Sequence, residues 1–95
     1  MSLFVIAEMR AVPGQEKRLR DAVEAMVEPS LAEPGCVSYR PFVDTSDPAH
    51  VVIVEEWTDG EVLDEHFRTP HFEQVAKVLD EILAEPLVIR RLVAE

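Results

Sequence analysis

Apolar residues recur along this chain with two different periods, and the order in which these periods follow one another most constrains the fold. Apolar residues recur at every second position in residues 3–11, and then at every third or fourth position from Leu19 to Leu31. A period of two is typical of strands, and a period of three to four is typical of amphipathic helices. Followed to residue 93, the pattern predicts the order strand, helix, strand, strand, helix, strand.

Four strands are predicted, at residues 3–11, 36–43, 51–57 and 87–93. Because the first is apolar on both sides at its start, we expect it to be central or covered on both faces. Pro41 favours an edge or a bulge for the second strand, since proline cannot donate to a strand neighbour. Residues 44–48 are expected to form a polar turn.

Two helical regions separate these strands. In the first, Pro29 is expected to end or bend the helix, because proline lacks the N–H that an interior turn needs. The second comprises a short helix at residues 61–68 and a longer one in which Thr69 is the expected N-cap and Pro70 the first helical residue.

The element order is that of a ferredoxin-like, split βαβ fold, an α+β class with an antiparallel sheet. Its helices cover one face of the sheet, yet apolar residues occupy both faces of the predicted strands. A second copy packed sheet to sheet would bury the other face, so we predict a homodimer. The 95 residues (1–95) are expected to form a single domain.

Charge and cysteine content argue against several classes of partner. The net charge of −10 disfavours nucleic acid, which requires clustered Lys and Arg, and also anionic membrane surfaces. The start of the chain has no basic region and only a short apolar run, so we expect no membrane span and a cytoplasmic location. The single cysteine, Cys36, cannot form an internal disulfide, and we expect it to be a small core residue.

Residues 55–72 concentrate the side chains best suited to chemistry: the only Trp, two of the three His and two Phe. His66 follows apolar residues at helical spacing, so we expect it to point partly inward. It is either a satisfied core histidine or a general base, for which its near-neutral pKa is suited. Trp57 is either core packing or a pocket wall for a flat ring.

Four other side chains are candidates for substrate binding, each with a structural alternative. His71 lies in the first turn of a helix, which favours a structural role there. Phe67 and Phe72 favour the core but could line a cavity. Tyr39 could point into the same cavity or stack at a dimer interface. Two histidines five positions apart, with Pro70 between them, are not expected to share a metal ion.

Glu8 and Glu55 interrupt otherwise apolar strands. A strand carboxylate usually lies at a solvated or interface edge, often paired with an arginine. If either is instead buried in a pocket, its pKa rises and it becomes a rival base to His66.

Four motifs carry a resemblance to a known family. They are A-E-M-R-A-V-P-G-Q-E at 7–16, A-E-P-G-C-V-S-Y at 32–39, E-x-W at 55–57 and H-F-x-T-P-H-F at 66–72. Together they resemble the antibiotic biosynthesis monooxygenase domain and its quinol monooxygenase-like members, over almost the whole chain. The resemblance implies a ferredoxin-like, dimeric α+β barrel.

The resemblance also implies an activity. Some members oxygenate quinols or polycyclic phenols with molecular oxygen and without metal, flavin or haem. The protein would then need an apolar pocket and a proton acceptor, for which we expect His66. The residues expected to bind the small aromatic substrate are Trp57, Tyr39, Phe67, Phe72 and His71. Haem-degrading members carry an Asn and a His ligand where this chain has Met9 and Ala76, so no haem is expected.

Two other functions stay open. A dimeric small-molecule-binding or accessory protein without catalysis would explain why no cluster is unambiguously catalytic. An isomerase of a small phosphorylated carbonyl compound, an activity of other relatives, would need an anion site. Its candidate donors are Arg10, Arg40, Arg68, Arg90 and Arg91.

Overall fold

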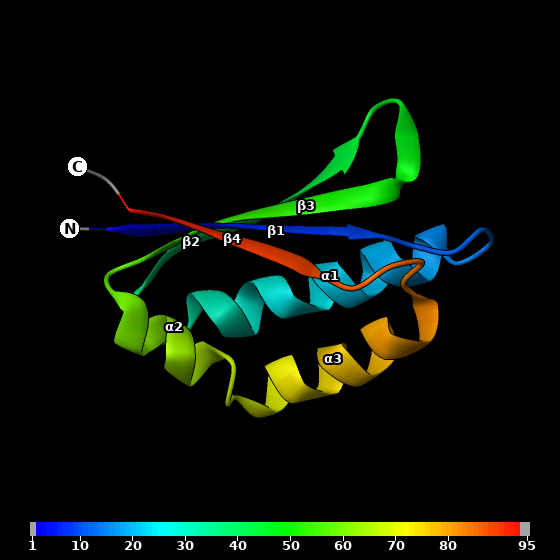
Figure 1. Cartoon of the computed structure of the whole chain (residues 1–95). Helices are drawn as coiled ribbons and strands as arrows, with labels where there is room; N and C mark the ends of the chain where they lie inside the picture. Colours follow the sequence, from blue (N-terminus) through cyan, green and yellow to red (C-terminus); the bar gives the residue numbers. More distant parts are fainter. Residues whose placement is uncertain (1, 94–95) are drawn as a thin grey trace.

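The computed structural model describes residues 2–93 as one antiparallel sheet with helices on one face (Figure 1). The elements are β1 (Leu3–Arg10), α1 (Glu16–Leu31), β2 (Cys36–Asp44), β3 (Asp47–Trp57), α2 (Gly60–His66), α3 (Pro70–Ile82) and β4 (Val88–Val93). The strand order is β2-β3-β1-β4. The predicted ferredoxin-like α+β fold is therefore confirmed.

Two predictions about individual strands are also confirmed. β1 is central, pairing with β3 on one side and β4 on the other. Pro41 lies in β2, which is an edge strand, so the missing N–H of proline leaves no gap inside the sheet. The pairing of β2 with β3 shifts register near both ends of β2.

The predicted five-residue turn at 44–48 is wrong, because β2 and β3 extend almost to meet each other. Asp44 Oδ1 accepts a hydrogen bond from the Ser46 N–H at 2.8 Å, and Asp47 Oδ1 accepts one from the Ala49 N–H at 3.0 Å. These short local contacts satisfy backbone donors at the tip and allow a tight hairpin. The tip of this hairpin bends away from the helices (Figure 1).

Pro29 does not end the first helix, since α1 continues through it to Leu31. The residue after the helix closes its last turn, with the Ala32 N–H donating to the Glu28 carbonyl. The proline therefore falls where few intrahelical bonds remain to be lost, and burial of the neighbouring Ser30 anchors this end of the helix.

The core lies between the sheet and the helices, and every second residue of β1 and β3 points into it. The buried strand residues are Leu3, Val5, Ala7, Met9, Val51, Ile53, Glu55 and Trp57. Helices α1, α2 and α3 contribute Leu19, Val23, Met26, Leu63, Leu79 and Ile82. Glu55 is the one carboxylate among these positions, and its burial among apolar neighbours makes it chemically unusual.

The opposite side of the sheet, which we name the open face, carries large exposed apolar side chains. Phe42 and Leu92 are 51% and 50% exposed, and Val54 and Val88 are also exposed. No helix of residues 2–93 covers this face (Figure 1). Within the same range, no helix is both long enough and apolar enough to span a membrane.

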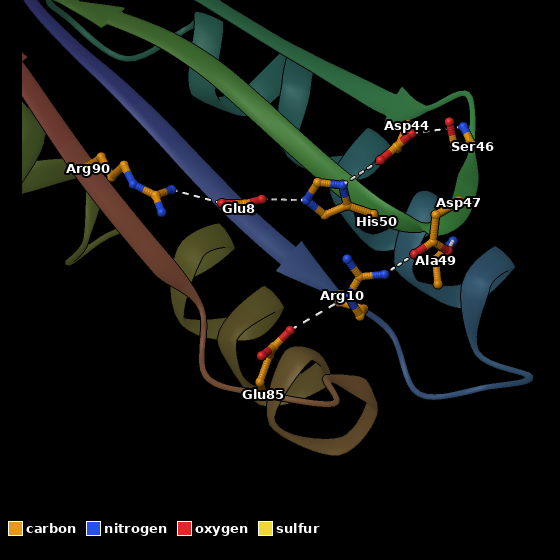
Figure 2. A network of polar contacts seen from close by, with 9 residues as sticks. All are labelled: Glu8, Arg10, Asp44, Ser46, Asp47, Ala49, His50, Glu85 and Arg90. Carbon is orange, nitrogen blue, oxygen red and sulfur yellow. Dashed lines mark hydrogen bonds and ion pairs between the residues drawn. The ribbon is translucent and has the colours of Figure 1, made fainter.

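A row of polar side chains crosses one end of the open face (Figure 2). Glu8 accepts from Arg90 at 2.8 Å and contacts His50 Nε2 at 2.6 Å, and His50 Nδ1 lies 3.0 Å from Asp44. Hydrogen bonds to Asp44 and Glu8 raise the pKa of His50. Glu8 is thus the arginine-paired strand carboxylate that its position predicted. Arg10 pairs with Asp47 beside this row.

Candidate functional site

Three side chains from distant parts of the chain meet at the end of the helical layer. Glu33 lies in the turn after α1, His66 is the last residue of α2, and His71 is in the first turn of α3. Glu33 Oε2 lies 2.7 Å from His66 Nδ1 and 2.7 Å from His71 Nε2. One carboxylate oxygen therefore contacts both histidines.

Thr69 holds the two histidines close, although Pro70 separates them in sequence. Its Oγ1 donates to the carbonyl of His66 at 2.7 Å and accepts from the Phe72 N–H at 3.2 Å. Thr69 is the N-cap of α3 and Pro70 its first residue, as predicted. The chain turns between α2 and α3 so that both rings face Glu33, with their centroids 6.0 Å apart.

Glu33 selects the tautomer of His66. Because an ionised carboxylate only accepts hydrogen bonds, Nδ1 of His66 must carry the proton, and Nε2 of the neutral ring is then an acceptor. Burial lowers the pKa of His66, against the opposing effect of its hydrogen bond to Glu33. The neutral imidazole is thus the form poised to take up a proton.

His66 borders an inner cavity of about 30 Å³ between the sheet and the helices. Its polar lining groups are His66, Tyr39 and Glu55, and the rest of the wall is apolar, including Phe67 and Phe72. None of the described residues that line it is an Arg or a Lys. The chemistry available at this cavity is therefore proton transfer next to an apolar ring, rather than binding of an anion.

Glu55 is the second titratable group of the inner cavity. It is buried, and its Oε1 accepts a hydrogen bond from Trp57 Nε1 at 2.9 Å. Burial raises the pKa of Glu55 to about 7, because the single hydrogen bond from Trp57 offsets only part of the lost solvation. Near neutral pH this carboxyl group can therefore either give or accept a proton.

The other two titratable groups nearby stay protonated. Burial, followed by the charge of Glu55, raises the pKa of Tyr39 above its ordinary range, so its hydroxyl remains a hydrogen-bond donor. Burial and the nearby Glu33 raise the pKa of Cys36 to about 11. A thiol in that state is a poor nucleophile. Cys36 itself is only partly buried and packs against the core, where a core residue was expected.

An apolar partition lies between the inner cavity and a second space. On its outer side lies an open groove of about 330 Å³ between α3 and residues 83–87, which we name the outer groove. Phe72, Leu79 and Leu87 line both spaces. A ligand in the outer groove is therefore one side chain away from the inner cavity.

The residues predicted for the site separate into three groups. His66, Tyr39, Phe67 and Phe72 line the inner cavity. His71 contacts Glu33 and lines a different groove, between α1 and α3. Trp57 is fully buried, with its ring 4.7 Å from that of His66, and does not line the inner cavity.

No pattern in the sequence pointed to Glu33. It lies in a Glu-Pro-Gly segment that marks the end of a helix, and no apolar repeat assigns its side chain a direction. Its partners follow 33 and 38 positions later, so only tertiary packing brings them together.

Known proteins resemble this chain in sequence and in structure. The family model described as antibiotic biosynthesis monooxygenase matches residues 2–78. The Escherichia coli K12 protein named probable quinol monooxygenase YgiN is 33% identical, over 81% of this chain and 84% of its own length. An uncharacterized protein of Synechocystis, sll1783, is 28% identical over 93% of this chain, which spans only 60% of that relative.

The solved structure of PA3566 from Pseudomonas aeruginosa has a TM-score of 0.93 and 31% sequence identity, covering 99% of this chain and 94% of that one. The family match includes Glu33, His66 and His71, and most of the residues that line the inner cavity. This chain belongs to the antibiotic biosynthesis monooxygenase family.

Proposed function

We propose that this chain is a cofactor-independent monooxygenase of a small, quinol-like aromatic substrate, with His66 as the proton acceptor. The observation that carries the proposal is the hydrogen bond from His66 Nδ1 to Glu33, which makes Nε2 an acceptor on a ring that borders the inner cavity. The E. coli relative, named as a probable quinol monooxygenase, supports the substrate class.

The reaction converts a hydroquinone and O₂ into a hydroxyquinone and water. His66 Nε2 takes the proton of a phenol, and the electron-rich phenolate gives one electron to O₂. The two radicals then join through a new carbon–oxygen bond, and the proton held by His66 converts the resulting peroxide anion to a ring hydroperoxide. Loss of the ring C–H proton and breakage of the O–O bond release water and leave a new carbonyl. The protein supplies proton transfer and an apolar site, and the substrate supplies the electrons.

Glu55 is suited to the second proton transfer. The hydroxide that leaves when the O–O bond breaks needs a proton, and Glu55 borders the same cavity as His66. With a pKa of about 7, its carboxyl group is partly protonated at neutral pH. His66, whose pKa is lowered by burial, is therefore available as the base, and Glu55, whose pKa is raised by burial, as the acid.

An aromatic substrate requires the inner cavity to widen. Its volume of about 30 Å³ holds a water molecule, whereas an apolar cavity of roughly 150 Å³ accommodates benzene. Rotation of Phe72 and its partition neighbours would join the inner cavity to the outer groove of about 330 Å³. The ring would then lie against Tyr39 and Phe67, within reach of His66.

The proposed enzyme acts as a homodimer formed through the open face. The exposed apolar side chains of this face, among them Phe42, Val54 and Leu92, would be buried against a second copy. Burial of apolar area at about 25 cal/mol per Å² is the general driving force for such association. The helices and the inner cavity would then lie on the outside of each protomer.

Oxygen uptake with a panel of hydroquinones tests the activity. The wild type should consume O₂, and His66→Ala should lower kcat by about 100-fold or more, the usual contribution of a positioned base. Glu24→Ala changes an exposed position of α1, away from the inner cavity and the open face, and should retain the wild-type rate. Equal rates for wild type and His66→Ala would remove His66 from the mechanism.

The same panel separates the proposal from its alternatives. Thermal stabilisation by quinols with no turnover of any phenol would favour the non-catalytic binding protein. The isomerase alternative needs an anion site, and the described lining of the inner cavity has no cationic side chain. Binding of phosphate esters there would contradict the present proposal.

A further inference from the structure

We propose that Glu33, His66 and His71 form a binding site for one divalent transition-metal ion such as Zn²⁺. The three donor atoms, Oε2, Nδ1 and Nε2, all lie within 4.8 Å of one another. Two imidazoles and one carboxylate are ligands that zinc and its neighbours in the first transition series prefer. This inference goes beyond the proposed oxygenase activity, which uses no metal.

The donor spacing is close to that of a metal site. Zinc binds imidazole nitrogen and carboxylate oxygen at about 2.0–2.2 Å, which places tetrahedral ligands about 3.4 Å apart. Glu33 Oε2 is 2.7 Å from each histidine nitrogen, as expected when protons occupy the space between them. When one ion takes their place, each ring keeps its proton on its other nitrogen, and each contact lengthens by about 0.7 Å.

The surroundings hold the donors in place. The side chains of His66, Glu33 and His71 are 2%, 11% and 24% exposed, so their conformational freedom is already restricted. The ring of His66 packs against two aromatic rings, with its centroid 4.7 Å from that of Trp57 and 5.3 Å from that of Phe72. Because Thr69 bonds the end of α2 to the start of α3, the spacing of the two histidines is set by the backbone. Preorganised ligands lose little entropy when an ion binds.

An ion can reach the cluster from the groove between α1 and α3. This groove has a volume of about 270 Å³, and His71 forms part of its wall. Three protein ligands leave a fourth tetrahedral position for water, as in zinc sites that are not purely structural. The net charge of −10 raises the concentration of cations near the surface.

The ion and the proposed base compete for one imidazole. A metal on Nδ1 of His66 forces the remaining proton of the neutral ring onto Nε2, which can then no longer accept a proton. If the proposed oxygenase function holds, the bound ion therefore inhibits turnover. This consequence rests on the proposed function, whereas the binding itself does not.

Calorimetric titration of the EDTA-treated chain with Zn²⁺ tests the site directly. We expect one ion per chain, and affinities at least tenfold weaker for Glu33→Gln and for His71→Ala. His71 is partly exposed, so its removal should leave the fold intact, as circular dichroism would verify. His50→Ala, which removes the imidazole of the open face between Glu8 and Asp44, is the matched control and should bind as the wild type does.

Nitrogen-15 spectra of the imidazoles provide a second readout. Addition of Zn²⁺ should shift Nδ1 of His66 and Nε2 of His71, and should leave His50 unchanged. Absence of binding, or unchanged affinity in both Glu33→Gln and His71→Ala, would overturn the metal site. Shifts confined to His50 would overturn it as well.

Oxygen uptake in the presence of Zn²⁺ separates the two proposals. Binding at the cluster with loss of turnover supports both. Stimulation by a divalent ion such as Fe²⁺ bound there would retain the site and overturn the cofactor-independent reaction. Turnover that depends on His66 without any ion binding would retain the reaction and overturn the site.

Discussion

A single carboxylate oxygen determines which nitrogen of His66 carries a proton. Among the described residues, Glu33 Oε2 is the only hydrogen-bond partner of His66 Nδ1. The same oxygen contacts His71 Nε2, also at 2.7 Å. The arrangement is physically similar to the carboxylate–histidine pair of hydrolases. In both, a carboxylate accepts a hydrogen bond from one ring nitrogen and leaves the lone pair of the other nitrogen free to take up a proton. The free lone pair here belongs to Nε2.

Glu33→Ala should lower the free energy of unfolding by about 2 kcal/mol, because a buried imidazole N–H loses its acceptor. Glu33→Gln keeps a carbonyl acceptor and should lose less. Urea denaturation measures both values. Glu24→Ala, at an exposed position of α1, is the matched control and should change the free energy little. Equal losses in Glu33→Ala and Glu24→Ala would show that the hydrogen bond contributes nothing.

The raised pKa of Glu55 makes stability depend on pH. The folded chain holds this proton up to a pKa of about 7, whereas the unfolded chain releases it near 4.5. The contribution of the protonated Glu55 to the stability of the folded chain is therefore complete below pH 4.5 and is lost as the pH rises through 7. The difference in pKa corresponds to about 3 kcal/mol.

Glu55→Gln replaces the titrating carboxyl group with a neutral amide. This variant should be more stable than the wild type at pH 8, with little difference between the two at pH 4.5. Urea denaturation at both values measures the change. Glu56→Gln, on the adjacent residue of β3 that faces the other side of the sheet, should follow the pH dependence of the wild type. Parallel curves for wild type and Glu55→Gln would contradict the assignment.

At the scale of the elements, the helix junction at Thr69 joins α2 to α3 through two hydrogen bonds. Thr69→Ala removes both and should lower the free energy of unfolding by about 1 kcal/mol, the usual effect of losing an N-cap. Thr69→Ser retains the hydroxyl and should retain most of the stability. The comparison by thermal unfolding isolates the cap, and equal losses in both variants would assign the effect to the methyl group instead.

Gly35 and Gly14 form a matched pair for testing the turn that carries Glu33. Both have positive φ, +88° and +91°, where an alanine is strained by about 1–2 kcal/mol. A Cβ at Gly35 would lie only 2.7 Å from Val62 and 2.8 Å from Thr58, whereas one at Gly14 meets open space. Gly35→Ala should therefore destabilise the chain clearly more than Gly14→Ala, as measured by urea denaturation. Similar losses would mean that α2 moves freely away from this turn.

The order of the elements was predictable, because each follows from a local period. The same locality explains the failures. The extent of the β2–β3 hairpin depends on the Asp44 and Asp47 side chains, which no local period reveals. The separation of His66 and His71 by Pro70 suggested two unrelated residues. Only tertiary packing shows that Glu33 joins them and that Trp57 lies behind His66 rather than in the wall of the cavity.

At the scale of the molecule, the helices of residues 2–93 cover one side of the sheet and leave the other uncovered. If the open face forms the homodimer, Phe42→Asp and Leu92→Asp should each shift the chain from dimer to monomer, since a buried, unpaired charge is strongly unfavourable. Light scattering after gel filtration measures the mass. Leu31→Asp replaces a similarly exposed apolar residue at the end of α1 and should leave the dimer intact. Dissociation by Leu31→Asp alone would place the interface elsewhere.

The partition of Phe72, Leu79 and Leu87 has a kinetic consequence. Because three packed side chains must rearrange before a ring can pass from the outer groove to the inner cavity, association is limited by how often the partition opens. Stopped-flow traces should then approach a constant rate at high ligand concentration instead of rising without limit. The opening rate of the partition, rather than the ligand concentration, would then set how fast any aromatic compound binds.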